Sequence, residues 1–250
     1  MSEVITTPPP PPPPPSGSYP PPPGSGSEPP KASFDFVKPF AFVFEDARWI
    51  NKVLIGGIFQ LLSALLVGIP FLLGYLAQLV RNVVANATLP LPEWDDLGEM
   101  FNEGLRLIGV AIVYFLPLLA ILAMIMIPMI VVTAAASHHN DDFDPGGLFA
   151  CVWCLFLPLT LVYAIWMPAA LMYAIVEQRF GAAFEFARIW RFISNNVGNY
   201  LLAVVVMFVA RFASGFGIVL FCVGIFFTVF WAMCVTFYAF AQTWKLATVK

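Results

Sequence analysis

Charged residues are scarce in this chain of 250 residues. Asp, Glu, Lys and Arg make up 11% of it, hydrophobic residues make up 60%, and the mean hydropathy is +0.84. A soluble globular protein of this length needs more polar surface, so the composition predicts an all-α, polytopic membrane protein. The net charge of -3 and the scattered Lys and Arg residues also provide no basic field. We therefore expect the lipid bilayer, and not nucleic acid, as a partner.

Cysteine and histidine are also rare. All cysteines lie in apolar runs, where they usually behave as small buried hydrophobes, so they fix no redox compartment. They are Cys151, Cys154, Cys222 and Cys234.

Both histidines stand in one acidic, turn-rich stretch directly before a C-x-x-C pair. It contains His138, His139, Asp141, Asp142, Asp144, Cys151 and Cys154. Zinc and copper use such ligands, but this spacing matches no known finger or ribbon, and the cysteines start inside an apolar run. A loop followed by a packed helix is the favoured interpretation, with a metal site or a redox dithiol left open. We assign no catalytic, cofactor-binding or metal-binding residue and expect no cofactor.

The chain contains several long runs without a charged residue. Val53–Val80 contains no charged residue, and as a helix it measures roughly 40 Å against a hydrocarbon core of about 30 Å. It predicts one crossing, tilted or bent at Pro70. Five spans are expected in all, over residues 52–80, 107–134, 148–176, 198–214 and 218–241. Internal prolines predict that the second and third are bent.

The last run, Tyr200–Gln242, carries a single charge, Arg211. One helix of this length would measure about 65 Å, so the run predicts two spans with a turn within Arg211–Gly217. Arg211 then lies at an interface. If the turn lies elsewhere, the guanidinium is inside the membrane and marks a functional site, although no span supplies an acidic partner.

Three polar segments separate the spans. Residues 34–51 read as an amphipathic entry helix with Phe40, Val43, Phe44, Ala47 and Ile50 on one face, and with Trp49 and Lys52 at the level of the lipid head groups. Residues 177–199 read as a second interfacial helix whose apolar face holds Phe186, Ile189, Trp190 and Ile193.

The third segment follows the first span. Asp96 and Glu99 there are spaced as a capping box, which predicts a short helix lying on the bilayer before the next span. Asp95, Asp96, Glu99 and Glu103 could form a cation site or an acid-base pair, but no His or Cys accompanies them. A capping role is favoured.

Residues 1–32 are rich in Pro, Gly and Ser and include the run Pro8–Pro15. This composition predicts a disordered, extended tether that precedes a transmembrane domain over residues 33–245. A ligand for a proline-recognition domain is the alternative. The first thirty residues lack the pattern of a signal peptide, so we expect the first span to direct targeting.

Several stretches carry a resemblance to a known family. They are Gly56-Gly57, Gly74-Tyr75, Leu91–Asp95, Glu103–Leu105, Phe184–Ile189, Asn199–Leu201 and Gln242. Together they resemble a prokaryotic integral membrane family known as domain of unknown function 4013, over roughly residues 35 to 245. The resemblance implies a multi-pass protein of the prokaryotic plasma membrane and implies no chemistry.

Function is expected to be non-enzymatic, in envelope organisation or as a partner subunit, because the spans hold no acid-base groups. A transporter or channel for a small or lipid-like solute is the alternative, and an enzyme using the histidine loop is the weakest. A membrane-protein partner and a homo-oligomer both stay open.

Five spans place the two ends of the domain on opposite faces of the membrane. One face then holds Lys38, Arg48, Lys52 and Arg211, and the other holds Arg81, Arg106, Arg179, Arg188, Arg191, Lys245 and Lys250. The count of Lys and Arg favours the second group on the cytoplasmic face. Export of a proline-rich tail without a signal peptide is less usual, however, and the first span often determines the orientation, so we expect a cytoplasmic N-terminus.

Overall fold

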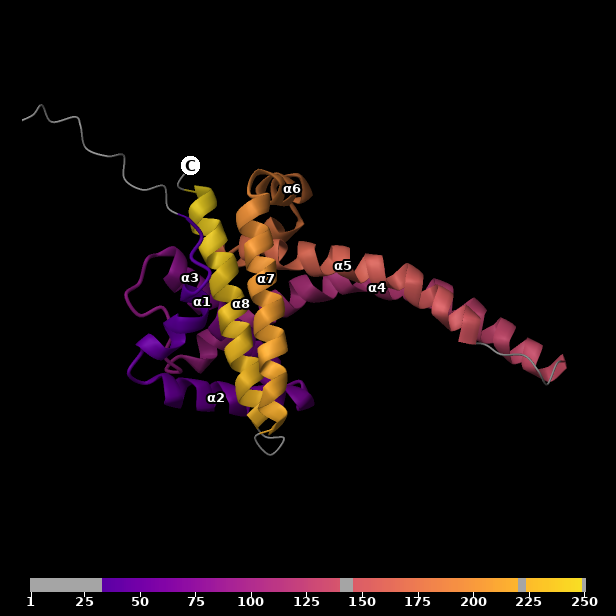
Figure 1. Ribbon diagram of the computed structural model, residues 1–250, viewed down its shortest axis with the longest axis horizontal. Helices are drawn as coiled ribbons and strands as arrows, with labels where there is room; N and C mark the ends of the chain where they lie inside the picture. The colour runs from indigo at the N-terminus through magenta and orange to yellow at the C-terminus, as the bar shows by residue number, and fades with distance from the viewer. Residues whose placement is uncertain (1–32, 140–145, 220–223, 249–250) are drawn as a thin grey trace, which may run out of the picture. The chain divides into compact units, whose positions relative to one another are not determined.

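A computed structural model describes residues 33–139, 146–219 and 224–248, and these ranges contain helices and no strand (Figure 1). The all-α prediction is confirmed. The elements are α1 Lys38–Ala41, η1 Phe42–Glu45, α2 Trp49–Leu62, η2 Ser63–Leu65, α3 Gly68–Val84, α4 Leu97–His139, α5 Gly146–Val176, η3 Phe180–Phe184, α6 Phe186–Asn195, α7 Val197–Gly215, η4 Phe216–Val219 and α8 Gly224–Thr248. The proline-rich tail lies outside the described residues.

Four helices in these ranges are long enough and apolar enough to cross a bilayer, namely α4, α5, α7 and α8. They correspond to the second through fifth predicted spans. The helix α7 ends at Gly215, inside the stretch where a turn was predicted. Arg211 therefore lies in the last turns of α7, and its side chain is exposed.

The first predicted span is not a single helix. It divides into α2 and α3, which are separated by η2 and by Leu66 in the left-handed conformation at φ 65°. The predicted bend at Pro70 is wrong, because Pro70 stands in the first turn of α3. The N–H groups of a first turn have no partner within the helix, so a proline there costs no helical hydrogen bond. Gly68 allows the close return, since a Cβ there would lie 1.9 Å from the Phe59 carbonyl oxygen.

The helices α3 and α4 touch through their backbones at two glycines. A Cβ on Gly74 would lie 1.9 Å from the carbonyl oxygen of Met100, and one on Gly104 would lie 1.7 Å from that of Pro70. Such contacts give extensive van der Waals packing between apolar helices.

The predicted short surface helix before the second span is instead the first part of α4. Asp96 caps it as expected, because its Oδ1 accepts a hydrogen bond of 2.9 Å from the Glu99 N–H. Met100 and Leu107 on its apolar face are fully covered. On the predicted apolar face, however, Leu97, Phe101 and Leu105 are 41%, 37% and 47% exposed, so this face is divided between contact with α3 and the outer surface.

The entry segment runs along α8. The Gln242 amide donates to the Asp35 carbonyl oxygen at 3.1 Å and accepts from the Asp35 N–H at 2.7 Å. Phe42 stacks on Tyr238 with ring centroids 4.3 Å apart. The predicted continuous amphipathic helix is wrong here, because the chain is extended at Asp46, and Phe42 and Val43 are the buried residues while Phe44 and Ile50 are exposed.

The antiparallel helices α7 and α8 are joined at both ends by threonine hydroxyls. Thr228 donates to the Ser214 carbonyl oxygen at 2.8 Å, and Thr243 donates to that of Asn199 at 3.3 Å. The helices α4 and α5 also lie side by side (Figure 1). Only 6% of the most apolar window of α4 is buried, compared with 50% for α8, so α4 exposes a long hydrophobic surface.

Candidate functional site

In the part of the chain that the structure describes, charged side chains form three larger ion-paired clusters near the ends of helices, besides the exposed pair of Lys38 and Glu45. In the first, Lys52 is 4% exposed, and its Nζ donates to Asp46 Oδ2 at 2.5 Å and to the Leu91 carbonyl oxygen at 2.9 Å. Glu93 Oε1 lies 2.7 Å from the same nitrogen. Burial alone would raise the pKa of Asp46, but the hydrogen bonds from Lys52 and from the Arg48 N–H, together with the charges of Lys52 and Arg48, outweigh it and lower that pKa.

This cluster holds the LPEW segment, Leu91–Trp94. The Trp94 indole donates to the Lys52 carbonyl oxygen at 3.1 Å and stacks on Tyr75, whose hydroxyl donates to the Pro92 carbonyl oxygen at 3.1 Å. Asp46 and the LPEW segment enclose Lys52, so its ammonium does not contact lipid; the predicted level of Trp49 and Lys52 at the head groups stays a prediction. The LPEW segment has a structural role.

The second cluster joins α3, α4 and the end of α5. Glu103 accepts from Arg81 at 2.8 Å and from Arg106 at 2.5 Å. Arg106 also donates to the carbonyl oxygens of Gln178 and Ala174. Within the part of the chain that the structure describes, no three His, Cys, Asp or Glu side chains are grouped as metal ligands. Asp96 is a cap, as the favoured interpretation of this acidic segment predicts, whereas Glu103 is an ion-pair partner of two arginines.

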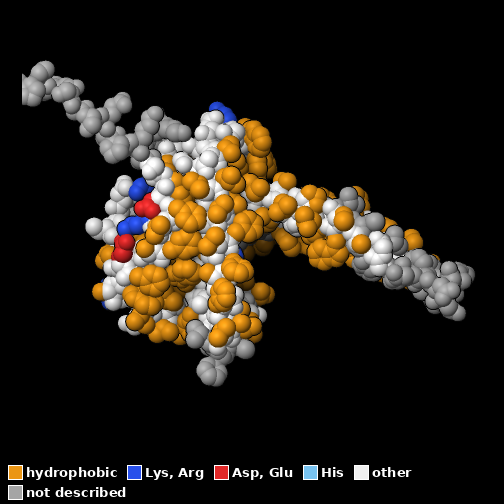
Figure 2. Space-filling view, in the orientation of Figure 1, with side chains coloured by type: hydrophobic (Ala, Val, Ile, Leu, Met, Phe, Trp, Pro, Cys, Tyr) orange, Lys and Arg blue, Asp and Glu red, His pale blue; other side chains and the backbone are white. Residues whose placement is uncertain are grey.

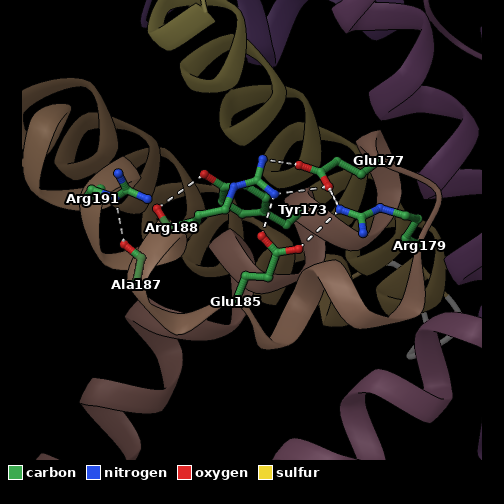
Figure 3. Close-up of polar contacts among 7 residues, drawn as sticks. All are labelled: Tyr173, Glu177, Arg179, Glu185, Ala187, Arg188 and Arg191. Carbon is green, nitrogen blue, oxygen red and sulfur yellow. Dashed lines mark hydrogen bonds and ion pairs between the residues drawn. The ribbon is translucent and has the colours of Figure 1, made fainter.

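The third cluster lies at the junction of α5 and α6 (Figure 3). Arg188 bonds to Glu185 at 2.5 Å and also to Glu177, while Arg179 bonds to the same two carboxylates. The Arg188 guanidinium lies over the Tyr173 ring, 5.1 Å from its centroid. The two positive and two negative charges balance.

These ion pairs shift the pKa values of the carboxylates. Burial alone would raise the pKa of Glu177, but hydrogen bonds from Arg179 and Arg188 lower it. The hydrogen bond from Arg188 likewise lowers the pKa of Glu185, and it raises the pKa of Arg188 itself. Both carboxylates are therefore ionised at neutral pH and fully engaged, so neither is poised to act as a base.

Arg191 is the cation that remains at this junction. Its Nε donates to the Ala187 carbonyl oxygen at 3.3 Å, and over residues 33–139, 146–219 and 224–248 it has no carboxylate partner. The side chain is exposed.

Arg191 stands on an open cavity of about 350 Å³ between α5, α6 and α8. The cavity is lined by Tyr173, Arg188, Arg191, Phe192, Asn195, Asn196, Trp244, Ala247 and Thr248. Trp244 contacts the Tyr173 ring edge-on at 4.7 Å and the Phe192 ring at 5.3 Å, which makes one wall aromatic. The Arg191 guanidinium and the Asn195 amide beside an aromatic wall can hold a small anion such as a phosphate group.

The helix α6 has apolar side chains on two sides. Ile189 and Phe192 are buried against the protein, whereas Phe186 and Trp190 are 56% and 63% exposed. The predicted single face of Phe186, Ile189, Trp190 and Ile193 is therefore divided between the protein core and the outer surface. An exposed Trp and Phe on a helix that also carries arginines is typical of a helix in the membrane interface.

The other predicted candidates lie elsewhere. Residues 140–145 of the histidine loop lie outside the described residues, and so do the side chains of His138, His139 and Cys151. Cys154 is a free, exposed thiol on α5. The metal and redox alternatives for this loop therefore stay as predictions.

The pocket was missed at the level of sequence. Arg188 and Arg191 stand one helical turn apart, which was a visible signal, but Tyr173 and Trp244 reach the same cavity from distant helices. No local pattern shows that convergence.

Comparison with known families supplies the classification. The family model described as "Protein of unknown function (DUF4013)" matches residues 57–229, which is more than half of the chain. The chain belongs to this family. The match in this DUF4013 protein runs from α2 into α8, so it includes Arg188 and Arg191 but not Trp244. No curated protein and no solved structure matches the chain.

Proposed function

We propose that this protein is a non-enzymatic integral protein of the prokaryotic plasma membrane that organises the envelope by binding phosphate-bearing lipid head groups. The observation that carries the proposal is the open pocket with the unpaired Arg191 on α6, a helix that exposes Phe186 and Trp190 next to it. A helix with this pattern lies where head groups are found.

The chemistry of the pocket suits a phosphodiester. Arg191 offers a planar set of N–H donors that no carboxylate of the described chain occupies, and Asn195 and Thr248 add polar groups at the wall. Arg188 is neutralised by Glu177 and Glu185, so it positions the aromatic wall through Tyr173 more than it supplies charge. No carboxylate is among the side chains that line the pocket, and the nearby Glu177 and Glu185 are held by arginines, so the pocket favours binding over acid-base catalysis.

Lipid binding by the purified protein tests this proposal. Native mass spectrometry of the protein released from nanodiscs would compare phosphatidylglycerol with an uncharged glycolipid. Arg191→Gln is expected to reduce phosphatidylglycerol retention about tenfold, since a hydrogen bond to a charged group contributes about 1.5 to 3 kcal/mol. The matched control is Arg211→Gln, which removes an exposed arginine far along α7 from the pocket. Equal retention in the wild type and Arg191→Gln would contradict the proposal.

A role as a partner subunit is compatible with head-group binding. The helices α4 and α5 expose apolar side chains over most of their length, as the hydrophobic surface in Figure 2 shows. Such a surface fits lipid tails, a second copy of the chain or another membrane protein equally well. Crosslinking from Leu116 or Val131 on α4, both more than half exposed, would separate these occupants.

Transport of a small or lipid-like solute is the second candidate. It is favoured by the discontinuity between α2 and α3, because broken helices form substrate sites in many transporters. Phosphatidylglycerol scrambling or solute flux in proteoliposomes, absent from protein-free vesicles, would support transport over organisation.

A further inference from the structure

The helices α2 and α3 form a hairpin whose apolar turn has no cover within the described protein. Leu65, Leu66 and Val67 at the turn are 71%, 73% and 58% exposed. Every residue from Val53 to Val80 is uncharged. We infer that this hairpin inserts into the bilayer hydrocarbon from the same membrane face as the α4–α5 and α7–α8 pairs, so that both ends of the folded unit lie on one face.

The open end of the hairpin is fixed by polar contacts. Lys52, in the first turn of α2, donates to the Leu91 carbonyl oxygen, and Asn82, in the last turn of α3, donates to the Pro90 carbonyl oxygen at 3.0 Å. The start of α2 and the end of α3 are therefore bound to the same short segment. The chain enters and leaves the hairpin at one level.

The closed end of the hairpin, around Leu65–Val67, is apolar. Beyond the uncharged turn, Ile58 and Leu61 on α2 are also 54% and 49% exposed. The arms contain 14 and 17 residues, about 21 and 26 Å as helices, which is less than a hydrocarbon core of about 30 Å. The polar side chains at this end, Gln60 and Ser63, are partly buried and bond to each other, so the exposed surface is mainly apolar, matches lipid tails and continues the apolar character of the four long helices.

The two ends of the folded unit meet. Asp35 is paired through its backbone with the amide of Gln242, in the last two turns of α8. The α7–α8 pair returns to the level at which it began, as the contacts Ser214–Thr228 and Asn199–Thr243 show. An odd number of crossings would separate Asp35 from Gln242 by the membrane thickness, so the five-span prediction cannot hold for a chain folded in this way.

Charge is almost absent from the segments that would lie in the hydrocarbon. Over residues 53–80, 107–139, 146–176 and 192–219 together with 224–244, the only Asp, Glu, Lys or Arg is Arg211. The other described charges lie outside these segments. Figure 2 shows charged side chains on the left edge and at the top of the molecule, with hydrophobic side chains over most of the rest of that view.

Single-cysteine labelling tests the inference without any use of lipid binding, so its failure is distinct from failure of the proposed function. Starting from the full chain with its native cysteines replaced, Val37→Cys, Thr88→Cys and Gly181→Cys each place a thiol at an exposed position. An impermeant maleimide is applied to intact cells and to inside-out vesicles. All three thiols are expected to label from the same side. Labelling of Val37→Cys and Thr88→Cys from opposite sides would overturn the inference.

Leu65→Cys tests whether the turn of the hairpin is inserted. It is expected to resist labelling from the side on which Val37→Cys reacts. Labelling of Leu65→Cys from that side would show that the hairpin lies outside the bilayer, and would also overturn the inference. Each variant is used only if it elutes in size-exclusion chromatography as a single species at the same volume as the wild type.

Discussion

Gly104 of α4 lies so close to Pro70 of α3 that a Cβ on the glycine would stand 1.7 Å from the proline carbonyl oxygen. Because the near atom belongs to the backbone, the helices themselves must separate to admit a methyl group. We expect Gly104→Ala to lower the free energy of unfolding by about 1 to 3 kcal/mol, as overpacking does elsewhere. Unfolding in mixed micelles would measure the loss.

The control for that change is Gly198→Ala on α7, where a new Cβ meets nothing within 4 Å. Alanine is the better helix former, so this variant is expected to be neutral or slightly stabilised. Equal losses in the two variants would show that helix propensity, and not close approach, governs Gly104.

Removing the buried ammonium of Lys52 is expected to destabilise the protein strongly. Lys52→Met leaves Asp46 buried without its partner, which typically costs about 3 to 5 kcal/mol. Lys38→Met, which breaks the more exposed pair with Glu45, is the control and should cost less than about 1 kcal/mol. The double variant Asp46→Asn/Lys52→Met should recover part of the loss, and no recovery would mean that Lys52 acts mainly through its other partners, Glu93 and the Leu91 carbonyl.

Acid is expected to weaken the junction of α5 and α6. The folded-state pKa of Glu177 lies below its ordinary value of 4.5, so its ion pairs stabilise the fold fully above that value. This stabilisation is lost as the pH falls through the lower, folded-state pKa. Melting temperatures should therefore show Glu177→Gln below the wild type at pH 7, with the two converging below pH 4. A constant difference across this range would exclude ionisation as the cause.

The Trp94 indole N–H is expected to contribute to stability separately from its ring. Trp94→Phe keeps an aromatic ring near Tyr75 but leaves the Lys52 carbonyl oxygen without that donor, which should cost about 1 to 3 kcal/mol. Trp190→Phe, on the exposed side of α6, is the matched control and should change the free energy of unfolding little. Similar losses in both would point to ring size as the determinant.

Sequence reasoning predicted the features that depend on local chemistry. The uncharged runs predicted the four long helices, Asp96 predicted the cap of α4, and the glycine-rich stretch predicted the end of α7. Each depends on residues within a few positions of one another.

The features that it missed depend on partners far away in the chain. Hydropathy does not distinguish one long helix from a hairpin that turns at Leu66, since both are equally apolar. The burial of Lys52 requires the LPEW segment to fold back some forty residues later. The pocket at Arg191 likewise depends on Trp244 of the last helix.

The contact between Asp35 and Gln242 has a consequence for biosynthesis. The first residues of the folded unit leave the ribosome long before α8 is synthesised. Gly56 and Gly57 of α2 pack against Phe230 and Phe227 of α8, so these contacts also form late. The α2–α3 hairpin must therefore remain without its final neighbours while most of the chain is translated. During that interval its apolar helices must be kept out of contact with water. The fold is completed only when the last helix has been translated.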